Sequence, residues 1–129
     1  MKRQTPSTPE GAAAARAART KSPDEALASL MRLCARAERS SGDALRLMQR
    51  WGLSEGDRQQ VLQRLVRDRF IDDARYAEAF VRDKLRLSGW GEYKIRAALL
   101  RKGIARTTID AALRQTDREA MGRRLEEQL

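Results

Sequence analysis

Basic side chains gather in one part of this sequence, and they are its strongest chemical signal. Residues 75–106 hold nine of them against three acidic residues, which leaves a net charge of +6 over 32 residues. The basic residues are Arg75, Arg82, Lys84, Arg86, Lys94, Arg96, Arg101, Lys102 and Arg106. Arginine predominates, and its planar guanidinium makes bidentate contacts with phosphate and carboxylate groups. The pattern predicts a surface that binds an acidic partner such as nucleic acid, with an ordinary solvated face as the alternative.

Aromatic residues lie within and near this basic stretch. Trp90 stands between two glycines, where it could stack on a nucleic-acid base or a partner surface, or cover the core as a lid. Tyr76 and Phe80 are four residues apart, a helical spacing that favours the core over a binding platform. Trp51 lies where a helix is predicted to end, which favours packing between helices. Trp90 is therefore the aromatic residue that we include among the candidate contact residues.

Few residues could support catalysis or bind a metal. The sequence has no histidine, which excludes Ser-His-Asp and Cys-His nucleophilic systems and histidine metal ligands. Asp72 and Asp73 form a carboxylate pair, but neighbouring side chains at a helix start point apart, and helix capping explains both. Cys34 lies in an apolar stripe, where cysteine acts as a small hydrophobic residue. We therefore predict no enzyme activity, no catalytic residue, no metal site and no cofactor.

The overall composition is that of a small basic protein. The 129 residues include 22 Arg and 5 Lys against 18 acidic residues, for a formal net charge of +9. A single cysteine cannot form an intrachain disulfide, which favours a reduced, cytoplasmic setting. No apolar run approaches the roughly 20 residues of a membrane span. We expect a cytoplasmic monomer that makes no membrane contact.

The elements that must position these residues are all predicted to be helices. Residues 1–21 are Ala-rich and basic and lack large apolar side chains, so we expect a disordered tail. A capping box at residues 22–25 starts a helix over about residues 23–39. Apolar residues then recur at helical spacing in further stretches between polar or glycine-containing breaks. A second capping box, residues 116–119, is expected to open a seventh helix, and the fold class is all-α.

An internal repeat connects these helices. Arg50-Trp51-Gly52-Leu53 matches Arg101-Lys102-Gly103-Ile104 at an offset of 51 residues, and neighbouring apolar positions align as well. The sequence therefore predicts tandem three-helix repeats with helix-turn-helix-like units. Residues 22–69 form the first repeat, residues 70–115 form the second, and residues 116–129 begin a third.

Several stretches resemble the RecX family of regulatory proteins. Phe70–Phe80 (FIDDARYAEAF) is similar to the signature that opens the family's second repeat, and Ser88–Ile104 (SGWGEYKIRAALLRKGI) is similar to the helix that follows it. Upstream, Cys34–Ser40 and Val61–Leu65 fit the first repeat, and the resemblance covers about residues 24–117. It implies a fold of tandem three-helix repeats, in agreement with the internal repeat.

The resemblance also implies a function. Members of this family are non-enzymatic modulators of the RecA recombinase, which bind the filament of RecA on single-stranded DNA, lodge in its helical groove, and restrain ATP hydrolysis and strand exchange. The region that carries over holds the candidate contact residues Arg75, Arg82, Lys84, Arg86, Trp90, Lys94, Arg96, Arg101 and Lys102. Family members usually complete a third repeat, which this chain only begins, so a short form and a truncated form stay open. A stand-alone helical DNA-binding module is the alternative function, because three-helix units can act as helix-turn-helix readers.

Overall fold

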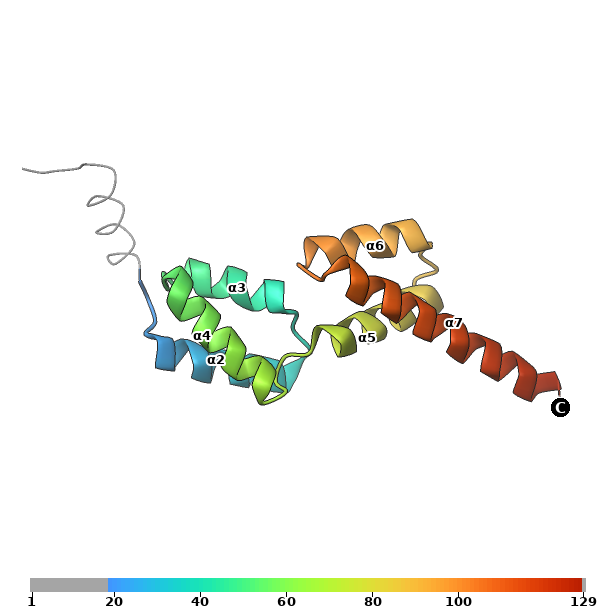
Figure 1. The fold of residues 1–129 in the computed structure, drawn as a ribbon, viewed down its shortest axis with the longest axis horizontal. Coiled ribbons are helices and arrows are strands. Elements are labelled where there is room, and N and C mark those ends of the chain that lie inside the picture. Colours follow the sequence, from blue (N-terminus) through green and yellow to red (C-terminus); the bar gives the residue numbers. More distant parts are fainter. Residues whose placement is uncertain (1–18, 129) are drawn as a thin grey trace, which may run out of the picture. The chain divides into compact units, whose positions relative to one another are not determined.

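Six helices and no strand occur in the part of the chain that the structure, a computed structural model, describes, residues 19–128. The helices are α2 (Pro23–Arg36), α3 (Ser41–Arg50), α4 (Glu55–Arg67), α5 (Asp73–Arg86), α6 (Glu92–Arg101) and α7 (Arg106–Gln128) (Figure 1). The predicted all-α fold class is confirmed for these residues. The disordered tail that we predicted over residues 1–21 lies outside the described residues except for its last three positions.

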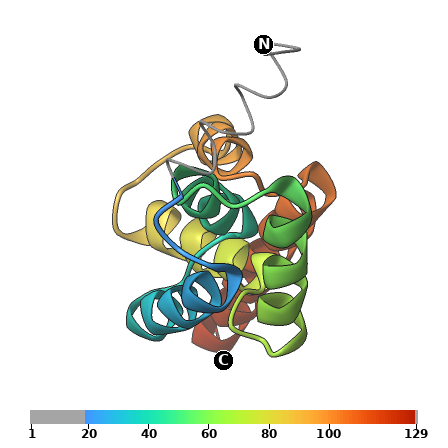
Figure 2. The same cartoon turned by 90° about the vertical axis from the view of Figure 1, so that its left-hand side faces the viewer.

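The chain divides into two compact units. The first unit holds the described residues up to Ala37 together with Ala44–Phe70, and the second holds Glu38–Asp43 together with the described residues from Ile71 on. Within the first unit α2 packs against α4, and within the second α5 packs along α7, with α6 against both (Figures 1 and 2). The segment Glu38–Asp43 differs from the predicted first repeat, since it packs in the second unit.

Helix α2 begins with the predicted capping box. The Ser22 hydroxyl accepts a hydrogen bond from the backbone N–H of Glu25 (3.1 Å), and the Glu25 carboxylate accepts one from the backbone N–H of Ser22 (2.8 Å). The bond from the Ser22 backbone is the main reason that the pKa of Glu25 lies below its ordinary value. The helix ends at Arg36 rather than near residue 39, because the backbone becomes extended at Ala37 and the next residues pack in the second unit.

Helices α3 and α6 end in the same way, which gives the internal repeat a structural form. Gly52 and Gly103 follow them with φ of +83° and +82°, a left-handed conformation that glycine adopts readily. The next residues, Leu53 and Ile104, are buried, and each donates its N–H to the carbonyl oxygen five residues earlier at 3.1 Å. The matching motifs therefore encode the same C-terminal cap, in which a hydrophobic residue follows a left-handed glycine.

Polar contacts hold the segment Glu38–Asp43 in the second unit. Ser40 is fully buried, and its hydroxyl accepts a hydrogen bond from the N–H of Asp43 (3.1 Å), so it caps the start of α3. The same hydroxyl donates to the carbonyl oxygen of Lys102 (2.9 Å) at the end of α6. A buried serine whose donor and acceptor are both satisfied fixes this segment against α6.

The adjacent carboxylates before and in α5 have structural roles. Asp72 caps α5 as predicted, because its side chain accepts a hydrogen bond from the backbone N–H of Arg75 (3.1 Å). Asp73 accepts hydrogen bonds from the backbone N–H and the hydroxyl of Ser41, the first residue of α3. The two side chains therefore have different partners, which agrees with our interpretation that they are not an acid–base pair.

One apolar core fills the second unit. Its buried residues are Ala77, Val81, Ile95, Leu99, Ile104, Ile109, Ala112 and Leu113. They come from α5, α6, the loop after α6 and α7, at the helical spacing that the sequence showed. Tyr76, Phe80 and Trp90 are partly buried and pack against this core. The core interpretation of Tyr76 and Phe80 is therefore confirmed, and Trp90 does lie over the core.

Helix α7 corrects the prediction of a separate seventh helix. It runs without a break from Arg106 to Gln128, through the capping box expected at residues 116–119. Thr116 is 6% exposed, and its hydroxyl donates to the carbonyl oxygen of Ala112 (3.0 Å), one turn earlier in the same helix. A threonine that bonds backward within a helix does not cap a new one. The expected helix start at residue 116 is therefore wrong.

Candidate nucleic-acid interface

Three aromatic rings and two lysines meet on the second unit, and we call them the Trp90 cluster: Tyr76, Phe80, Lys84, Trp90 and Lys94. The Tyr76 and Phe80 rings are stacked with centroids 6.1 Å apart, and Phe80 meets Trp90 edge-on at the same separation. The ammonium groups of Lys84 and Lys94 lie 4.7 and 4.2 Å from the centroid of the Trp90 ring. Both distances are within the range of cation–π attraction.

Local sequence explains how the cluster forms. Tyr76, Phe80 and Lys84 are spaced four residues apart on α5, which places them on one face of the helix. Gly89 has a φ of +66°, so the chain turns back after α5, and the N–H of Trp90 donates to the carbonyl oxygen of Lys84 (2.9 Å). This turn lays the Trp90 ring on the core and under the two lysines.

The Trp90 cluster joins features that a single nucleic-acid strand can use. Aromatic faces stack on bases with little dependence on base identity, and ammonium groups attract the phosphates. Lys84 and Lys94 already lie over Trp90, so a base that stacks on this ring must displace at least one ammonium. A displaced lysine ammonium would be free to pair with a phosphate, because its four-carbon stem is flexible.

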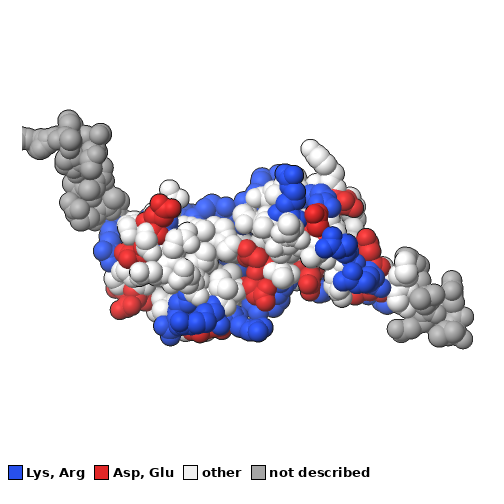
Figure 3. All heavy atoms as spheres, viewed as in Figure 1, with Lys and Arg blue, Asp and Glu red and all other residues white. Residues whose placement is uncertain are grey.

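Much of the basic charge predicted for residues 75–106 is compensated in the structure. Four candidate contact residues are paired within the described part of the chain: Arg75 with Glu38 (2.7 Å), Arg82 with Glu119 (3.2 Å), Arg96 with Asp110 (2.5 Å) and Lys102 with Asp43 (3.5 Å). All four acidic partners lie outside residues 75–106, so charge counted along that stretch missed them. Figure 3 shows basic and acidic side chains interspersed over α5, α6 and α7.

Arg96 has carboxylate partners on two helices. It donates to Asp110 on α7 and to Glu92 one turn earlier on α6. These hydrogen bonds, above all the one to Asp110, raise the pKa of the Arg96 guanidinium above its ordinary value. The structure thus brings Lys84, Trp90 and Lys94 together, ties Arg96 to α7, and leaves Arg86 and Arg101 as exposed side chains outside the cluster.

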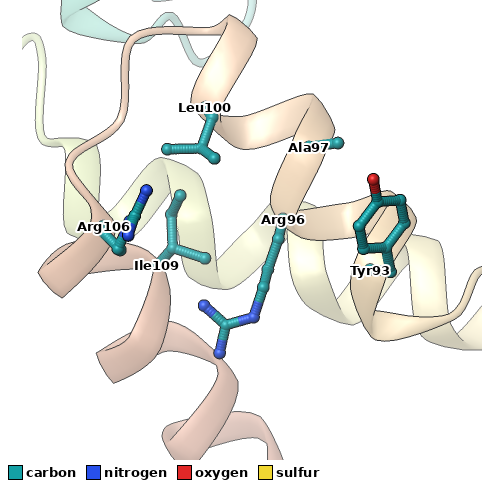
Figure 4. A pocket seen from close by; sticks show the side chains of 6 residues that line it. All are labelled: Tyr93, Arg96, Ala97, Leu100, Arg106 and Ile109. Carbon is teal, nitrogen blue, oxygen red and sulfur yellow. The ribbon is translucent and has the colours of Figure 1, made fainter.

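An apolar hollow of about 320 Å³ lies between α6 and the start of α7. Figure 4 shows the side chains that line it: Tyr93, Arg96, Ala97, Leu100, Arg106 and Ile109. Tyr93 is 87% exposed and Leu100 is 45% exposed, so α6 presents apolar surface at this hollow. Sequence reasoning missed both residues. Their spacing with Ala97 (i, i+4, i+7) is a second apolar stripe on α6, and that signal was present. Such a hollow fits an apolar side chain of a protein partner.

Neither a cluster of metal ligands nor a membrane-spanning helix is found in the described residues. Among them, no group of three or more His, Cys, Asp or Glu side chains could hold a metal ion. None of the helices in residues 19–128 is both long and apolar enough to cross a membrane.

Sequence comparison links the second unit to a known family. Residues 72–113 match the family described as RecX, second three-helix domain, and all five residues of the Trp90 cluster lie in this range. The chain is 36% identical over 87 residues to the regulatory protein RecX of Pseudomonas putida (strain F1), an alignment that covers 67% of this chain and 55% of that protein. It is 36% identical over 90 residues to RecX of Chlorobium phaeobacteroides, with coverage of 70% and 60%.

Solved structures agree with this relationship. A crystal structure of a regulatory protein RecX matches with a TM-score of 0.68 and 27% identity, over 72% of this chain and 47% of that one. RecX from Lactobacillus salivarius matches in fold, with a TM-score of 0.67 and 21% identity, over 70% of this chain and 59% of that one. The chain spans about half the length of the relatives that it matches.

Proposed function

We propose that this chain, which belongs to the RecX family of regulatory proteins, binds the RecA filament on single-stranded DNA and restrains its ATP hydrolysis and strand exchange. In this proposal the chain is a regulator with no catalytic activity of its own, and it acts as a monomer in the cytoplasm. One observation carries the proposal: the Trp90 cluster, a cationic aromatic surface suited to a single strand, lies inside the range that matches the family.

The second unit offers separate contacts for the two components of such a filament. The Trp90 cluster supplies the Trp90 ring and two ammonium groups for the DNA strand, where binding depends on salt and little on sequence. The hollow beside Tyr93 and Leu100 supplies exposed apolar surface for the recombinase protein. Exposed tyrosines are common where protein interfaces are strongest.

The candidate contact residues differ in what they can contribute. Lys84 and Lys94 have no carboxylate partner in the described residues, so they can bind phosphate without breaking an ion pair. Arg75, Arg82, Arg96 and Lys102 must first leave a carboxylate, which reduces the net gain. Arg86 and Arg101 are exposed and stay proposed as outer contacts. Contact with the strand is therefore expected mainly from Lys84, Trp90 and Lys94.

ATP hydrolysis by RecA on single-stranded DNA tests the proposal. We expect the chain to lower the hydrolysis rate at amounts below one copy per RecA. The variant Lys84→Gln/Lys94→Gln is expected to need a roughly tenfold higher concentration, because it removes two phosphate contacts. Arg64→Gln/Arg67→Gln on α4 is the matched control, since it removes the same charge from exposed side chains that already pair with Asp68.

Two results would contradict the proposal. The first is unchanged hydrolysis together with no binding of the chain to the filament. The second is tight binding to duplex DNA with a marked sequence preference that RecA does not affect, which would favour a stand-alone DNA-binding module.

A further inference from the structure

A second hollow lies on the first unit, around Trp51, and we call it the Trp51 pocket. Its volume is about 240 Å³, and it is lined by Lys21, Ser29, Arg32, Leu33, Arg36 and Trp51. Four of these residues come from α2 at spacings of three and four, so they form one stripe along that helix. The pocket lies outside the range that matches the family, residues 72–113, and none of its residues is in the basic stretch of the sequence.

The backbone around Gly52 fixes this arrangement. The N–H of Trp51 donates to the carbonyl oxygen of Leu47 in α3, and its carbonyl oxygen accepts from the N–H of Thr20, both at 2.9 Å. The chain before α2 can lie this close because position 52 has no side chain: a Cβ there would be 2.6 Å from the Cα of Arg19. As a result, the ammonium of Lys21 lies 5.0 Å from the centroid of the Trp51 ring.

The charge of the Trp51 pocket is not compensated within the described residues. Lys21, Arg32 and Arg36 line it, no carboxylate does, and none of the three forms an ion pair in residues 19–128. Arg32 donates to the Ser29 hydroxyl, at 3.3 Å. Glu25 interacts electrostatically with Lys21, but its carboxylate also accepts a hydrogen bond from the backbone N–H of Ser22.

We propose that the Trp51 pocket binds single-stranded nucleic acid, with a base on the Trp51 indole and its phosphate among Lys21, Arg32 and Arg36. The base replaces the Lys21 ammonium on the ring, and that ammonium moves to the phosphate, so the cation keeps an electrostatic partner. Arg32 and Arg36 are one turn apart on the same face of α2 and can hold the same or successive phosphates. That the ligand is the single strand of a filament rests on the proposed function, whereas the binding site is inferred from the side chains of the first unit alone.

The shape and chemistry of the pocket favour a single strand over other acidic ligands. Its volume is below the roughly 300–1,000 Å³ of pockets that enclose a small ligand, so an open polymer that lies across it fits better than a metabolite. Bases in a duplex are stacked on one another and cannot reach the indole. An acidic polypeptide would satisfy the three cations but would leave the aromatic face unused.

Fluorescence of Trp51 tests this proposal directly. The chain has two tryptophans, so Trp90→Phe makes Trp51 the only reporter and also weakens the Trp90 cluster. We expect oligo(dT) of about 15 nucleotides, within the usual site size of single-strand binders, to quench Trp51 emission without any recombinase present. Adding Arg32→Gln/Arg36→Gln should weaken binding about tenfold and reduce the magnitude of the salt slope by about 1.4, since each lost phosphate contact removes about 0.7.

Matched controls distinguish an effect of the pocket residues on binding from an effect of net charge. Arg64→Gln/Arg67→Gln in the same background removes the same charge on α4 and should change affinity by less than about twofold. Lys21→Gln, which lies before α2, is the second test variant if the double variant loses helical circular dichroism. Equal effects of the α4 control and the pocket variant would overturn the proposal, as would the absence of Trp51 quenching.

Two further outcomes define the ligand and keep the proposals distinct. Quenching by polyglutamate as strong as that by oligo(dT) would assign the pocket to acidic protein and overturn a nucleic-acid site. A chain that restrains RecA hydrolysis but shows no Trp51 quenching would overturn the Trp51 pocket and leave the proposed function standing. A chain that shows Trp51 quenching but does not affect RecA would overturn the proposed function alone.

Discussion

The two tryptophans of the chain lie in different units and in different electrostatic settings. Trp90, in the second unit, has two lysines over its ring, but several arginines of the same unit are paired with carboxylates. Trp51, in the first unit, has one lysine over its ring and two arginines beside it that have no carboxylate partner within the described residues. Positive charge without a carboxylate partner in the described residues thus also occurs outside the longest basic stretch of the sequence. The local field depends on where the chain folds its carboxylates as well as on the number of basic residues.

The two units also share a feature, the left-handed glycine after the middle helix. At each site a Cβ would meet backbone: Gly103 faces the Cα of Gly42 at 2.9 Å, and Gly52 faces the Cα of Arg19 at 2.6 Å. Each glycine therefore serves two purposes, because it adopts a positive φ and admits a neighbouring segment. In the first unit that neighbouring segment carries Lys21 to the Trp51 ring.

The largest expected effect comes from removing this shared feature. Gly52→Ala and Gly103→Ala should each lower the free energy of unfolding by about 2 kcal/mol or more, since alanine adds left-handed strain of roughly 1–2 kcal/mol and a close contact. Urea unfolding followed by circular dichroism measures the loss. If only one of the two variants is destabilised, the shared cap does not contribute equally to the stability of the two units.

Two other glycines separate strain from crowding. Gly89 has a positive φ but open space around it, so Gly89→Ala should cost only the strain, about 1 kcal/mol. Gly56 lies in α4 with nothing near it, and Gly56→Ala should be neutral or stabilise by up to about 1 kcal/mol. If Gly89→Ala lowers the free energy of unfolding as much as Gly103→Ala does, the close contact of the added Cβ at position 103 contributes nothing to the loss.

Local sequence rules predicted most of the fold. The capping box at Ser22, the cap at Asp72 and the glycine ends of α3 and α6 depend on residues within six positions of one another, and all were predicted. The predicted start of a helix at Thr116 also followed from a local rule, but this prediction was wrong. Thr116 is 6% exposed, and its hydroxyl bonds to Ala112, so packing within the second unit decides the outcome there.

The candidate sites were harder to predict because they depend on contacts between distant residues. Trp90 and its lysines were named from a single stretch of sequence, since Lys84 and Lys94 are close to it along the chain. The carboxylates that pair with Arg75 and Arg82, by contrast, lie 37 residues away on either side. No charge count along the stretch could include them.

A smaller effect is expected from releasing the paired arginines of the second unit. Glu38→Gln/Asp110→Asn removes Glu38 from Arg75 and Asp110 from Arg96, which keeps its bond to Glu92, and should strengthen oligo(dT) binding roughly threefold to tenfold at about 50 mM salt. The magnitude of the salt slope should rise by up to about 1.4 if both released arginines contact phosphate. Fluorescence anisotropy of labelled oligo(dT) over about 50–200 mM salt measures both quantities.

The control for this prediction changes net charge by the same amount without releasing an arginine. Glu55→Gln/Asp117→Asn removes two exposed acidic side chains that form no ion pair in residues 19–128. Equal gains in the two double variants would mean that net charge alone sets affinity, and the contrast between the two units would lose its basis.

The smallest expected effect is on the stability of the chain at low pH, and it arises in the first unit, from Glu25 in the capping box. The pKa of Glu25 is lowered in the folded chain, first by its hydrogen bond with the Ser22 backbone, so the capping box contributes stability above the ordinary glutamate pKa of about 4.3. That contribution is lost as the pH falls through the lower pKa of the folded state. In the second unit the pKa of Arg96 is shifted in the opposite direction, upward. The stability that its hydrogen bonds contribute is therefore lost only in strong alkali. The urea midpoint of Glu25→Gln should therefore fall less than that of the parent chain between about pH 6 and pH 3. Parallel pH profiles for the two proteins would show that the Ser22 cap does not depend on the charge of Glu25.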